Sequence, residues 1–442
     1  MLEKPLARKD GKPERAVLVG LITRDQPRDL LAEYLDELEF LARTAHAETV
    51  QTFTQSLDHP DVRTFVGKGK FQEITEYIEE HDIDLLIFDD ELSPSQLRNL
   101  GEALPETKVL DRANLILDIF AQRARTAHAK TQVELAQYQY LLPRLTNMWT
   151  HLQKQKGGIG MKGPGEKEIE TDRRIIRDRI SALKKDLAAI DRQMATQRGN
   201  RGALVRVALV GYTNAGKSSL LNALCDRGQG RSVEARNSLF ATLDPTTRRL
   251  CLPRSGSAPR ELLITDTVGF LRKLPHQLVA SFHATLEEAL HADLLVVLVD
   301  GSSPEATEQL RAVDDVLQTL DADRLPRLTV LNKLDRVEDR ATLAPLWNID
   351  PHAIAVSVQE GEGLPDLFAA IQNHLAAVEN RVELLLPHTA GALHAEIRAK
   401  ATVLSEFYTE DGCLMEIQAS PAVLGRLMAN GAVPVQRPDP PA

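Results

Sequence analysis

The alternation of apolar and polar positions predicts short strands and helices between residues 15 and 110. Apolar runs and amphipathic stretches follow one another in the order "RAVLVGLI", "LLAEYLDELEFLARTA", "ETVQTFTQ", "DLLIFDD", "SQLRNLGEAL" and "TKVL". Strands that alternate with helices are typical of α/β domains, because each helix carries the chain back across the sheet. We therefore expect a small α/β domain with a mainly parallel sheet.

The segment "GKGK" at 67–70 has the composition of a phosphate-binding loop. However, no Ser or Thr follows the lysine, and the Gly-x4-Gly-Lys spacing is absent. We interpret it as a glycine turn that caps a strand.

From about 112 to 197 the apolar positions recur every three or four residues, which is the period of a helical seam. One seam is formed by Leu135, Tyr138, Leu142, Leu145, Trp149 and Leu152, and the other by Ile176, Ile180, Leu183, Leu187, Ile190 and Met194. Two such seams predict an antiparallel helical hairpin zipped along its length, with a bend at Pro143.

Between the two predicted helices lies "GGIGMKGPGEKEIETDRR", residues 157–174, which is too glycine-rich to be helical through Gly165. A helical hairpin needs only a few connecting residues. The net charge of −10 argues against a nucleic-acid partner, yet residues 154–185 hold ten Lys or Arg against five Asp or Glu. A solvated loop is one interpretation; we favour a basic tip whose exposed backbone meets nucleic-acid phosphates.

An apolar strand, a glycine loop and an amphipathic helix follow in "RVALVGYTNAGKSSLLNAL". The loop has the Gly-x4-Gly-Lys-Ser spacing of a phosphate-binding P-loop, in the strand–loop–helix context that the motif requires. Backbone N–H groups would surround the phosphates, Lys217 would bridge the β and γ oxygens as a catalytic group, and the Ser218 hydroxyl would bind Mg²⁺. The expected contacts are Gly211, Tyr212, Thr213, Asn214, Ala215, Gly216, Lys217, Ser218 and Ser219.

The segment "DTVGF" at 266–270 follows the apolar strand "ELLIT". Asp266 lies where a Walker-B carboxylate would hold Mg²⁺ through water, and the Gly269 amide would bond the γ-phosphate during hydrolysis. Thr267 and Val268 complete these nucleotide contacts. Phe270 replaces the glutamine that orients the attacking water in Ras-type enzymes, and it cannot do so by hydrogen bonding. We therefore expect slow hydrolysis by the chain alone.

The segment "NKLD" after the strand "LTVL" predicts selectivity for guanine. The Asp335 carboxylate can accept from the guanine N1–H and 2-amino groups, whereas adenine would leave a buried charge unpaired. Sites of this kind discriminate by roughly 10⁴-fold or more. "SVQ" fits the loop over the base. The expected contacts are Asn332, Lys333, Leu334, Asp335, Ser357, Val358 and Gln359. These motifs, in this order, predict a GTP-binding domain.

The segment that senses the γ-phosphate falls in "LFATLDPTTRRL", residues 239–250. We choose Thr242 to complete the Mg²⁺ shell and to act in catalysis, because a threonine on metal and phosphate couples loop order to nucleotide state. Thr246 and Thr247 remain rivals. The contacts expected around it are Phe240, Ala241, Thr242, Leu243 and Asp244. The predicted metal ligands are thus Ser218, Thr242 and Asp266.

At 442 residues the chain is long enough for about three domains, each with its own core. We assign 1–111 to an α/β domain resembling a nucleotide-binding fold, 112–200 to the helical hairpin and 203–378 to the GTPase domain. Residues 380–442 form a small α+β domain read as the strand "RVELLLP", the helix "GALHAEIRAKATVLSEFYT" and the strand "GCLMEIQAS".

The three cysteines lie far apart without a C-x-x-C pair, which argues against a disulfide framework or a zinc site and favours a reducing compartment. The longest apolar run, "LLVVLV" at 294–299, is too short to span a bilayer. We expect a cytoplasmic protein without a membrane span, with peripheral membrane association left open as a weak alternative.

The chain strongly resembles the HflX family of P-loop proteins from about residue 15 to 375. The resemblance is carried by the motifs above together with "DRANLILDIFAQRARTAHAKTQVELAQYQYLLPRL" at 111–145. It implies a monomeric GTPase that uses GTP, GDP and Mg²⁺, binds the large ribosomal subunit and its rRNA through the tip at 157–174, and splits stalled or idle ribosomes.

Two departures separate the chain from the family pattern. "GPGEK" at 163–167 replaces the common "GPGET", which adds a positive charge at the tip, and "SVQ" replaces "SAx", which affects only the fit of the base loop.

The missing water-positioning group leaves three sources open. The ribosome could supply it by ordering the segment around Thr242, His276 or His283 could supply it from within the chain, or K⁺ held near Asn214 could act in place of an arginine finger. Asn214 could equally brace the loop. A protein of another class, an RNA-binding assembly scaffold that only senses GTP, also fits the basic tip, although the intact Lys217, Ser218 and Asp266 favour turnover.

Overall fold

The computed structural model describes residues 13–148, 164–199, 204–226, 246–252, 260–273, 290–377, 380–419 and 421–435. Several predictions fall outside these ranges, namely those for residues 157–163, 240–244, Trp149, Leu152, His276 and His283. The described residues form two compact units: one holds those up to 194 together with 270–273, and the other holds the remainder.

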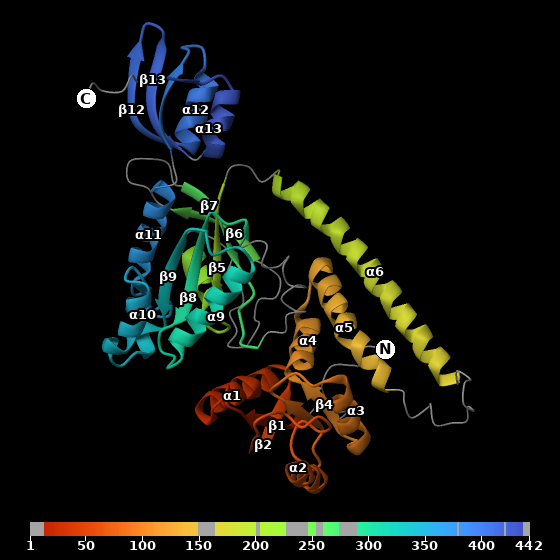
Figure 1. The fold of residues 1–442 in the computed structure, drawn as a ribbon. Helices are drawn as coiled ribbons and strands as arrows, with labels where there is room; N and C mark the ends of the chain where they lie inside the picture. The colour runs from red at the N-terminus through yellow and green to blue at the C-terminus, as the bar shows by residue number, and fades with distance from the viewer. Residues whose placement is uncertain are drawn as a thin grey trace. The chain divides into compact units, whose positions relative to one another are not determined.

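The first unit contains a four-stranded parallel sheet, as predicted, and its strand order is β2-β1-β3-β4 (Figure 1). Its elements are β1 (Glu14–Ile22), α1 (Arg28–Thr44), β2 (Ala47–Ser56), α2 (Lys68–His81), β3 (Leu85–Phe88), α3 (Pro94–Ala103) and β4 (Lys108–Asp111). Strand residues alternate between two faces. On one face, Val17, Val19 and Phe88 share a core with α2 and α3. Helix α1 packs against β1 at Gly20, where a Cβ would lie 2.7 Å from Leu31 Cδ1.

The "GKGK" segment does not cap a strand, which corrects our interpretation. It begins helix α2, with Gly67 as the preceding residue in an extended conformation. The Gly67 N–H donates to Gln55 Oε1 at 2.8 Å, and Lys70 pairs with Glu73. The lysines therefore belong to an amphipathic helix.

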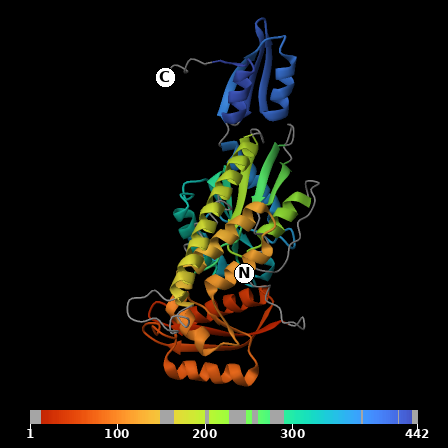
Figure 2. The same ribbon diagram turned by 90° about the vertical axis from the view of Figure 1, so that its right-hand side faces the viewer.

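Three helices follow: α4 (Arg112–Arg123), α5 (Ala127–Met148) and α6 (Pro164–Gly199). Helices α5 and α6 run side by side and antiparallel in both views (Figures 1 and 2), joined by the pairs Glu134–Arg179 and His128–Asp191. Helix α6 begins at Pro164, so Gly165 is helical, contrary to the prediction. A proline is tolerated in the first turn because its missing N–H has no partner there.

The prediction that the two helices pack along their apolar seams was only partly right for α5. Leu135 and Leu183 are buried, whereas the other seam residues with described side chains are half-buried. Helix α5 packs against α3 and α4 through a second face that the prediction missed. This face consists of Ala129, Val133, Ala136, Tyr140 and Arg144. The hairpin is therefore attached along α5 to the α/β part of its own unit.

The second unit holds a six-stranded sheet in the order β10-β9-β8-β5-β7-β6, parallel except for the β6–β7 pair. Its strands are β5 (Val205–Gly211), β6 (Thr246–Leu252), β7 (Arg260–Asp266), β8 (Leu294–Asp300), β9 (Arg327–Asn332) and β10 (Ile354–Ala355). Its helices are α7 (Lys217–Asp226), α9 (Ala306–Thr319), α10 (Ala344–Ile349) and α11 (Leu364–Ala377), with 3-10 turns η2 (Leu334–Arg336) and η3 (Arg340–Leu343). Helices α7 and α11 share one apolar core with the sheet, and α9 packs on β8.

The C-terminal residues form an antiparallel sheet in the order β12-β13-β11-β14, with helices on one face. The elements are β11 (Asn380–Leu386), α12 (Gly391–Lys400), β12 (Thr402–Thr409), β13 (Gly412–Ala419), α13 (Pro421–Ala429) and β14 (Val433–Pro434). The predicted helix over 391–409 was wrong in its second half, because "TVLSEFYT" is strand β12. Its β-branched and aromatic residues favour a pleated surface.

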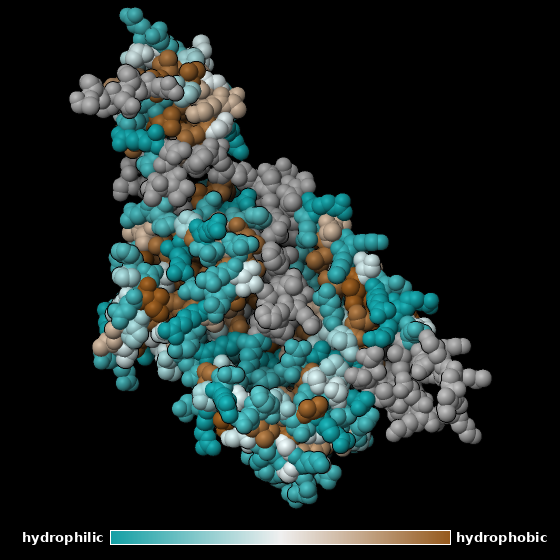
Figure 3. Space-filling view, in the orientation of Figure 1, coloured by the Kyte–Doolittle hydropathy of each residue, from teal (hydrophilic) through white to brown (hydrophobic). Residues whose placement is uncertain are grey.

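Large hydrophobic side chains are exposed mainly on this C-terminal module, where brown residues gather in Figure 3. Phe407 and Leu404 belong to the edge strand β12, and Val433 to the opposite edge. An antiparallel sheet covered on one face by helices leaves such residues on the other. Among the described residues, none of the helices combines the length and apolar composition that a membrane span requires.

Candidate functional site: a nucleotide-phosphate pocket

The carboxyl ends of neighbouring parallel strands bring the predicted site residues to one edge of the six-stranded sheet. Strand β5 ends at Gly211, β7 at Asp266 and β9 at Asn332, and helix α7 begins at Lys217. In open α/β sheets, ligands bind outside this edge, where loops from several strands meet. Motifs that are up to 121 residues apart in the sequence, from Gly211 to Asn332, thereby meet at one edge.

The glycines of the loop are required by close backbone contacts. Gly211 has φ +148°, and a Cβ there would lie 2.2 Å from the Leu298 carbonyl oxygen. Gly216 has φ +100°, and a Cβ would lie 2.2 Å from Asn332 Nδ2. Asn214 at the loop apex is exposed with φ +61°, a left-handed conformation that asparagine tolerates better than most residues. The loop therefore has the tight, backbone-lined shape that phosphate binding needs.

Lys217 is 6% exposed, and its ammonium group is held within the loop. Nζ donates to the carbonyl oxygens of Gly211 at 3.0 Å and Tyr212 at 2.8 Å. Burial lowers the pKa of Lys217 to about 8, while the nearby Asp266 carboxylate acts in the opposite direction. A phosphate oxygen within reach of Nζ would favour the charged form and raise that pKa again.

Ser218 and Asp266 form the oxygen pair expected of a Mg²⁺ site. The Ser218 hydroxyl donates to Asp266 Oδ2 at 2.6 Å, and Asp266 is fully buried. Adjacent oxygen ligands of octahedral Mg²⁺ lie about 2.9 Å apart, and Mg²⁺ prefers hydroxyl and carboxylate oxygens. The two residues therefore fit this ion, either directly or through its water shell.

Gly269 lies against the phosphate loop. A Cβ at this position would be 2.8 Å from Thr213 Cα and 2.9 Å from Lys217 Nζ. Any side chain would therefore collide with the loop and with the lysine. The backbone of residue 269 is thus close to where Lys217 would meet a γ-phosphate, as its predicted role demands.

The base-recognition residues are linked to the phosphate loop by Asn332. Its Nδ2 donates to the Ala215 carbonyl at 2.8 Å, and its Oδ1 accepts from the Val358 N–H at 3.2 Å. Asp335 Oδ1 accepts from the Ser357 hydroxyl at 2.6 Å. The structure thus brings the "NKLD" and "SVQ" segments together, with a carboxylate positioned beside the loop that would cover the base.

One partner in this region escaped the sequence analysis. Lys333, with φ +64°, pairs with Asp300 Oδ2 at 2.6 Å. Asp300 ends β8, in "LLVVLVD", at the same carboxyl edge as the other site residues. An acidic residue after a fully apolar strand was the available signal.

Thr242 and the neighbouring contacts at 240–244 lie outside the described residues, so their role remains a prediction. Of the two rivals, Thr247 shares a hydrogen bond with the Thr265 hydroxyl at 3.0 Å. Thr246 opens strand β6 opposite Asp266. Both belong to a strand pair, which suits a structural role better than a mobile switch.

The residues that follow Gly269 belong to the first compact unit. Phe270 is 5% exposed and Leu271 is also buried. Arg272 donates to Glu33 at 3.0 Å, and Lys273 pairs with Asp89 and, at 2.6 Å, with Asp90. The phosphate-site segment "DTVG" and this ion-paired anchor are consecutive in the chain.

A buried arginine stands at the centre of that anchor. Arg112 donates to Asp89 at 3.0 Å, to Glu37 at 2.6 Å and to the Tyr34 carbonyl at 2.9 Å. It also reaches the backbone carbonyl of Arg272 at 3.3 Å. This cluster was not predicted from the sequence, although the acidic "FDD" at the end of β3 could have indicated it.

Comparison with known proteins gives three consecutive matches to family models. Residues 32–121 match "GTP-binding GTPase N-terminal", residues 123–201 match "GTP-binding GTPase Middle Region", and residues 206–333 match "50S ribosome-binding GTPase". The three matches together cover the α/β, helical and P-loop parts of the chain.

Two relatives of this chain carry the name GTPase HflX. The chain is 45% identical to GTPase HflX of Magnetococcus marinus, over 94% of both chains, and 54% identical to GTPase HflX of Flavobacterium psychrophilum, over 73% of this chain and 76% of that one. A solved GTP-binding protein of Sulfolobus solfataricus in complex with GDP is 25% identical, covering 82% of this chain and 98% of that chain, with a TM-score of 0.45. On the strength of the two HflX relatives and of the P-loop domain just described, the chain belongs to the HflX family of GTPases.

Proposed function

We propose that this GTPase is a switch that binds the large ribosomal subunit and splits stalled or idle ribosomes. GTP orders the loops around the phosphate site, the ordered form engages the ribosome, and hydrolysis releases it. Support for the partner comes from the match of the P-loop domain to ribosome-binding GTPases and from the excess of basic residues at 154–185.

The observation that carries the proposal is the environment of Phe270. Its ring is buried and cannot hydrogen-bond a water, whereas Lys217, Ser218 and Asp266 provide an intact phosphate site. The site therefore holds groups suited to binding the phosphates, but Phe270 cannot orient the attacking water. We infer that the ribosome completes the site by ordering the segment around Thr242.

In this mechanism the chain holds and orients the nucleotide. Loop N–H groups and Lys217 bind the phosphates, Asp335 accepts from the guanine edge, and the Gly269 amide approaches the γ-phosphate. Ser218, Asp266 and Thr242 would hold Mg²⁺, which when bound neutralises the charge that develops on the phosphate oxygens. K⁺ beside Asn214 remains a further proposal, tested by comparing turnover in KCl and NaCl at equal ionic strength; equal rates would remove it.

The decisive experiment measures GTP turnover with and without purified large subunits, with Lys217→Ala as the blank. Completion of a Ras-type site by a partner is worth about 10⁵-fold, or roughly 7 kcal/mol. We expect strong stimulation, and we expect intact ribosomes to separate into subunits on a density gradient when GTP is present. Brisk turnover without subunits would place the water-positioning group within the chain, with His276→Ala and His283→Ala as the next variants.

The second candidate function is an RNA-binding assembly scaffold that senses GTP without turnover. The basic content of 154–185 favours it as much as it favours the switch. The two proposals separate in one comparison: a scaffold would bind subunits equally with GTP and with a non-hydrolysable analogue, and subunits would not accelerate hydrolysis.

A further inference from the structure

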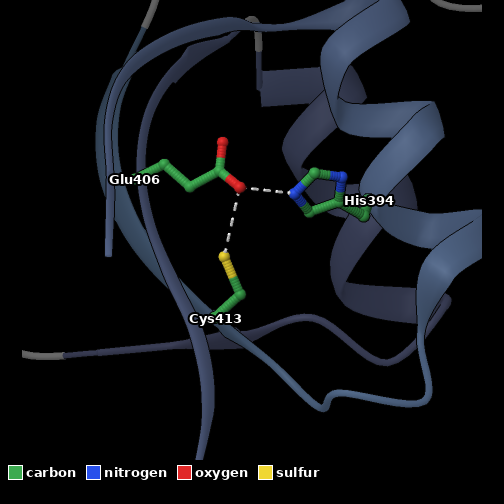
Figure 4. A group of neighbouring side chains, drawn as sticks. All are labelled: His394, Glu406 and Cys413. Carbon is green, nitrogen blue, oxygen red and sulfur yellow. Dashed lines mark hydrogen bonds and ion pairs between the residues drawn. The ribbon is translucent and has the colours of Figure 1, made fainter. Parts of the chain in front are cut away.

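Three side chains of metal-binding type converge in the C-terminal module, far in the sequence from the nucleotide site. His394 comes from α12, Glu406 from β12 and Cys413 from β13 (Figure 4). His394 Nε2 lies 2.8 Å from Glu406 Oε1, and Cys413 Sγ lies 3.7 Å from the same oxygen. All three ligand atoms lie within 4.8 Å of one another.

The cluster occupies a face of the sheet that is otherwise apolar. Cys413 is buried on β13 together with Met415 and Ile417, beneath α12 and α13. Glu406 pairs with Met415 across the two strands and so points to the same face. Of the three residues, Cys413 is buried and His394 and Glu406 are half-buried, so the cluster lies where this apolar face meets solvent.

The carboxylate is held as an anion. Glu406 Oε1 accepts from the Tyr408 hydroxyl at 2.8 Å, and Oε2 accepts from Arg398 at 2.5 Å. Arg398 binds only Oε2, whereas Oε1, which also accepts from Tyr408, is directed at the histidine and the cysteine.

The thiol is directed at the same carboxylate oxygen, with Cys413 Sγ and Glu406 Oε1 3.7 Å apart. A bound divalent ion would take the place of the Sγ proton, which would leave for solvent.

We propose that His394, Glu406 and Cys413 form a binding site for a thiophilic divalent cation of the zinc class. In tetrahedral zinc sites the ligand atoms are about 3.3 Å apart between N and O, and about 3.5 Å apart between sulfur and either. The N–O pair must open by about 0.5 Å from its present separation, and the S–O pair already fits. The imidazole would bind through Nε2 while keeping its other proton on Nδ1.

Ligand chemistry separates this site from the Mg²⁺ site of the P-loop. Sulfur and imidazole nitrogen select zinc and its relatives, whereas Mg²⁺ prefers oxygen alone. His394 and Glu406 are half-buried, so a water can reach the cluster and complete the shell. The bound ion would fasten α12 to the edge strand β12, and Arg398 and Tyr408 would support its carboxylate ligand.

The test uses the full-length protein, freed of nucleotide and treated with a chelator, and titrated with Co²⁺. A thiolate ligand in tetrahedral geometry produces a charge-transfer band and intense d–d bands, which oxygen-bound Co²⁺ at the P-loop lacks. We expect one equivalent to bind with these bands and Zn²⁺ to displace it. Cys413→Ser and His394→Gln should each weaken binding by at least about 100-fold, since loss of a ligand exceeds the effect of an outer partner.

Cys251→Ser is the matched control, because it removes an exposed thiol of the same chain. The spectrum should survive in this variant. Thermal unfolding with and without Zn²⁺ gives a second readout: the wild type and the control should gain stability from the ion, and folded Cys413→Ser and His394→Gln should not. Absence of the charge-transfer band, its loss in Cys251→Ser, or equal Zn²⁺ stabilisation of all variants would overturn the proposal and leave an ion-pair network that only holds helix to sheet.

Discussion

The chain contains two parallel sheets whose carboxyl edges have opposite uses. In the six-stranded sheet, this edge carries the glycine loop, Asp266 and Asn332. In the four-stranded sheet, Asp89 follows β3 and Asp111 ends β4, and both are fully buried. Arg112 and Lys273 pair with the first aspartate, and Arg144 lies 3.5 Å from the second.

The difference shows that strand topology offers a site without deciding its occupant. Buried carboxylates must be paired, and in the first sheet the partners are cations of the same chain. For Asp111, burial raises its pKa, while N–H groups of Asn114 and Leu92 and the charge of Arg144 oppose that shift. In the second sheet, glycines expose backbone N–H groups instead, and these favour an anion from outside.

The largest effect should come from removing the buried cation of the first sheet. Arg112→Met leaves Asp89 with Lys273 alone and Glu37 without its 2.6 Å partner. Breaking a buried pair costs about 3–5 kcal/mol. We expect a loss of about 3 kcal/mol in the free energy of unfolding, measured by urea denaturation. Arg179→Ala, which removes a half-exposed pair with Glu134, should cost much less, because solvent screens such pairs. Equal losses would contradict the comparison.

Removing the buried cation of the second sheet should affect chemistry more than stability. Lys217→Ala deletes the group expected to bridge the β and γ oxygens, and removal of one such donor slows catalysis by about 10²–10³-fold. Single-turnover hydrolysis with saturating GTP measures the effect. Arg311→Ala, which removes an exposed cation from α9 of the same unit, is the control, and we expect it to change the rate little. A Lys217→Ala rate close to wild type would refute the predicted role.

A smaller effect should come from Lys273, which pairs with acidic residues at the edge of the four-stranded sheet. It pairs with Asp89 and Asp90 only four residues after Gly269. Lys273→Met should free the residues after Gly269 and reduce ribosome-stimulated turnover by about tenfold, the equivalent of one charged hydrogen bond. Lys70→Met, which removes a pair with Glu73, is the control and should leave turnover unchanged. If both variants behave like wild type, the anchor has no part in the switch.

The smallest effect is a pH dependence of nucleotide binding. Phosphate binding favours protonated Lys217, whose pKa is about 8 before binding and higher afterwards. Affinity should therefore be full below pH 8 and fall several-fold as the pH rises toward 9. Fluorescence titration with a labelled GDP measures it. The arginine in Lys217→Arg stays charged throughout this pH range. Any loss of affinity that this variant shares with the wild type therefore arises from the guanine base of the nucleotide.

Local sequence was sufficient for both parallel sheets and for the phosphate loop. The spacing from Gly211 to Ser218 predicts its own strand–loop–helix context, because both glycines take a positive φ that residues with a side chain rarely adopt. It was insufficient where a segment had two competing tendencies. "TVLSEFYT" continues a helical pattern but becomes β12 once β13 is available for pairing.

The sequence by itself determined the chemistry of the P-loop domain. The glycine spacing and the residues Lys217, Ser218, Asp266 and Asp335 belong to short motifs, and each motif predicts the role of its residues. Only the tertiary structure decided which distant side chains share a space. The Arg112 cluster joins residues 33–37, 89, 112 and 272–273, and the His394, Glu406 and Cys413 cluster joins a helix with two strands. Neither has a local signature, because ion pairs and metal ligands depend on proximity in space, and burial strengthens those pairings only after the chain has folded.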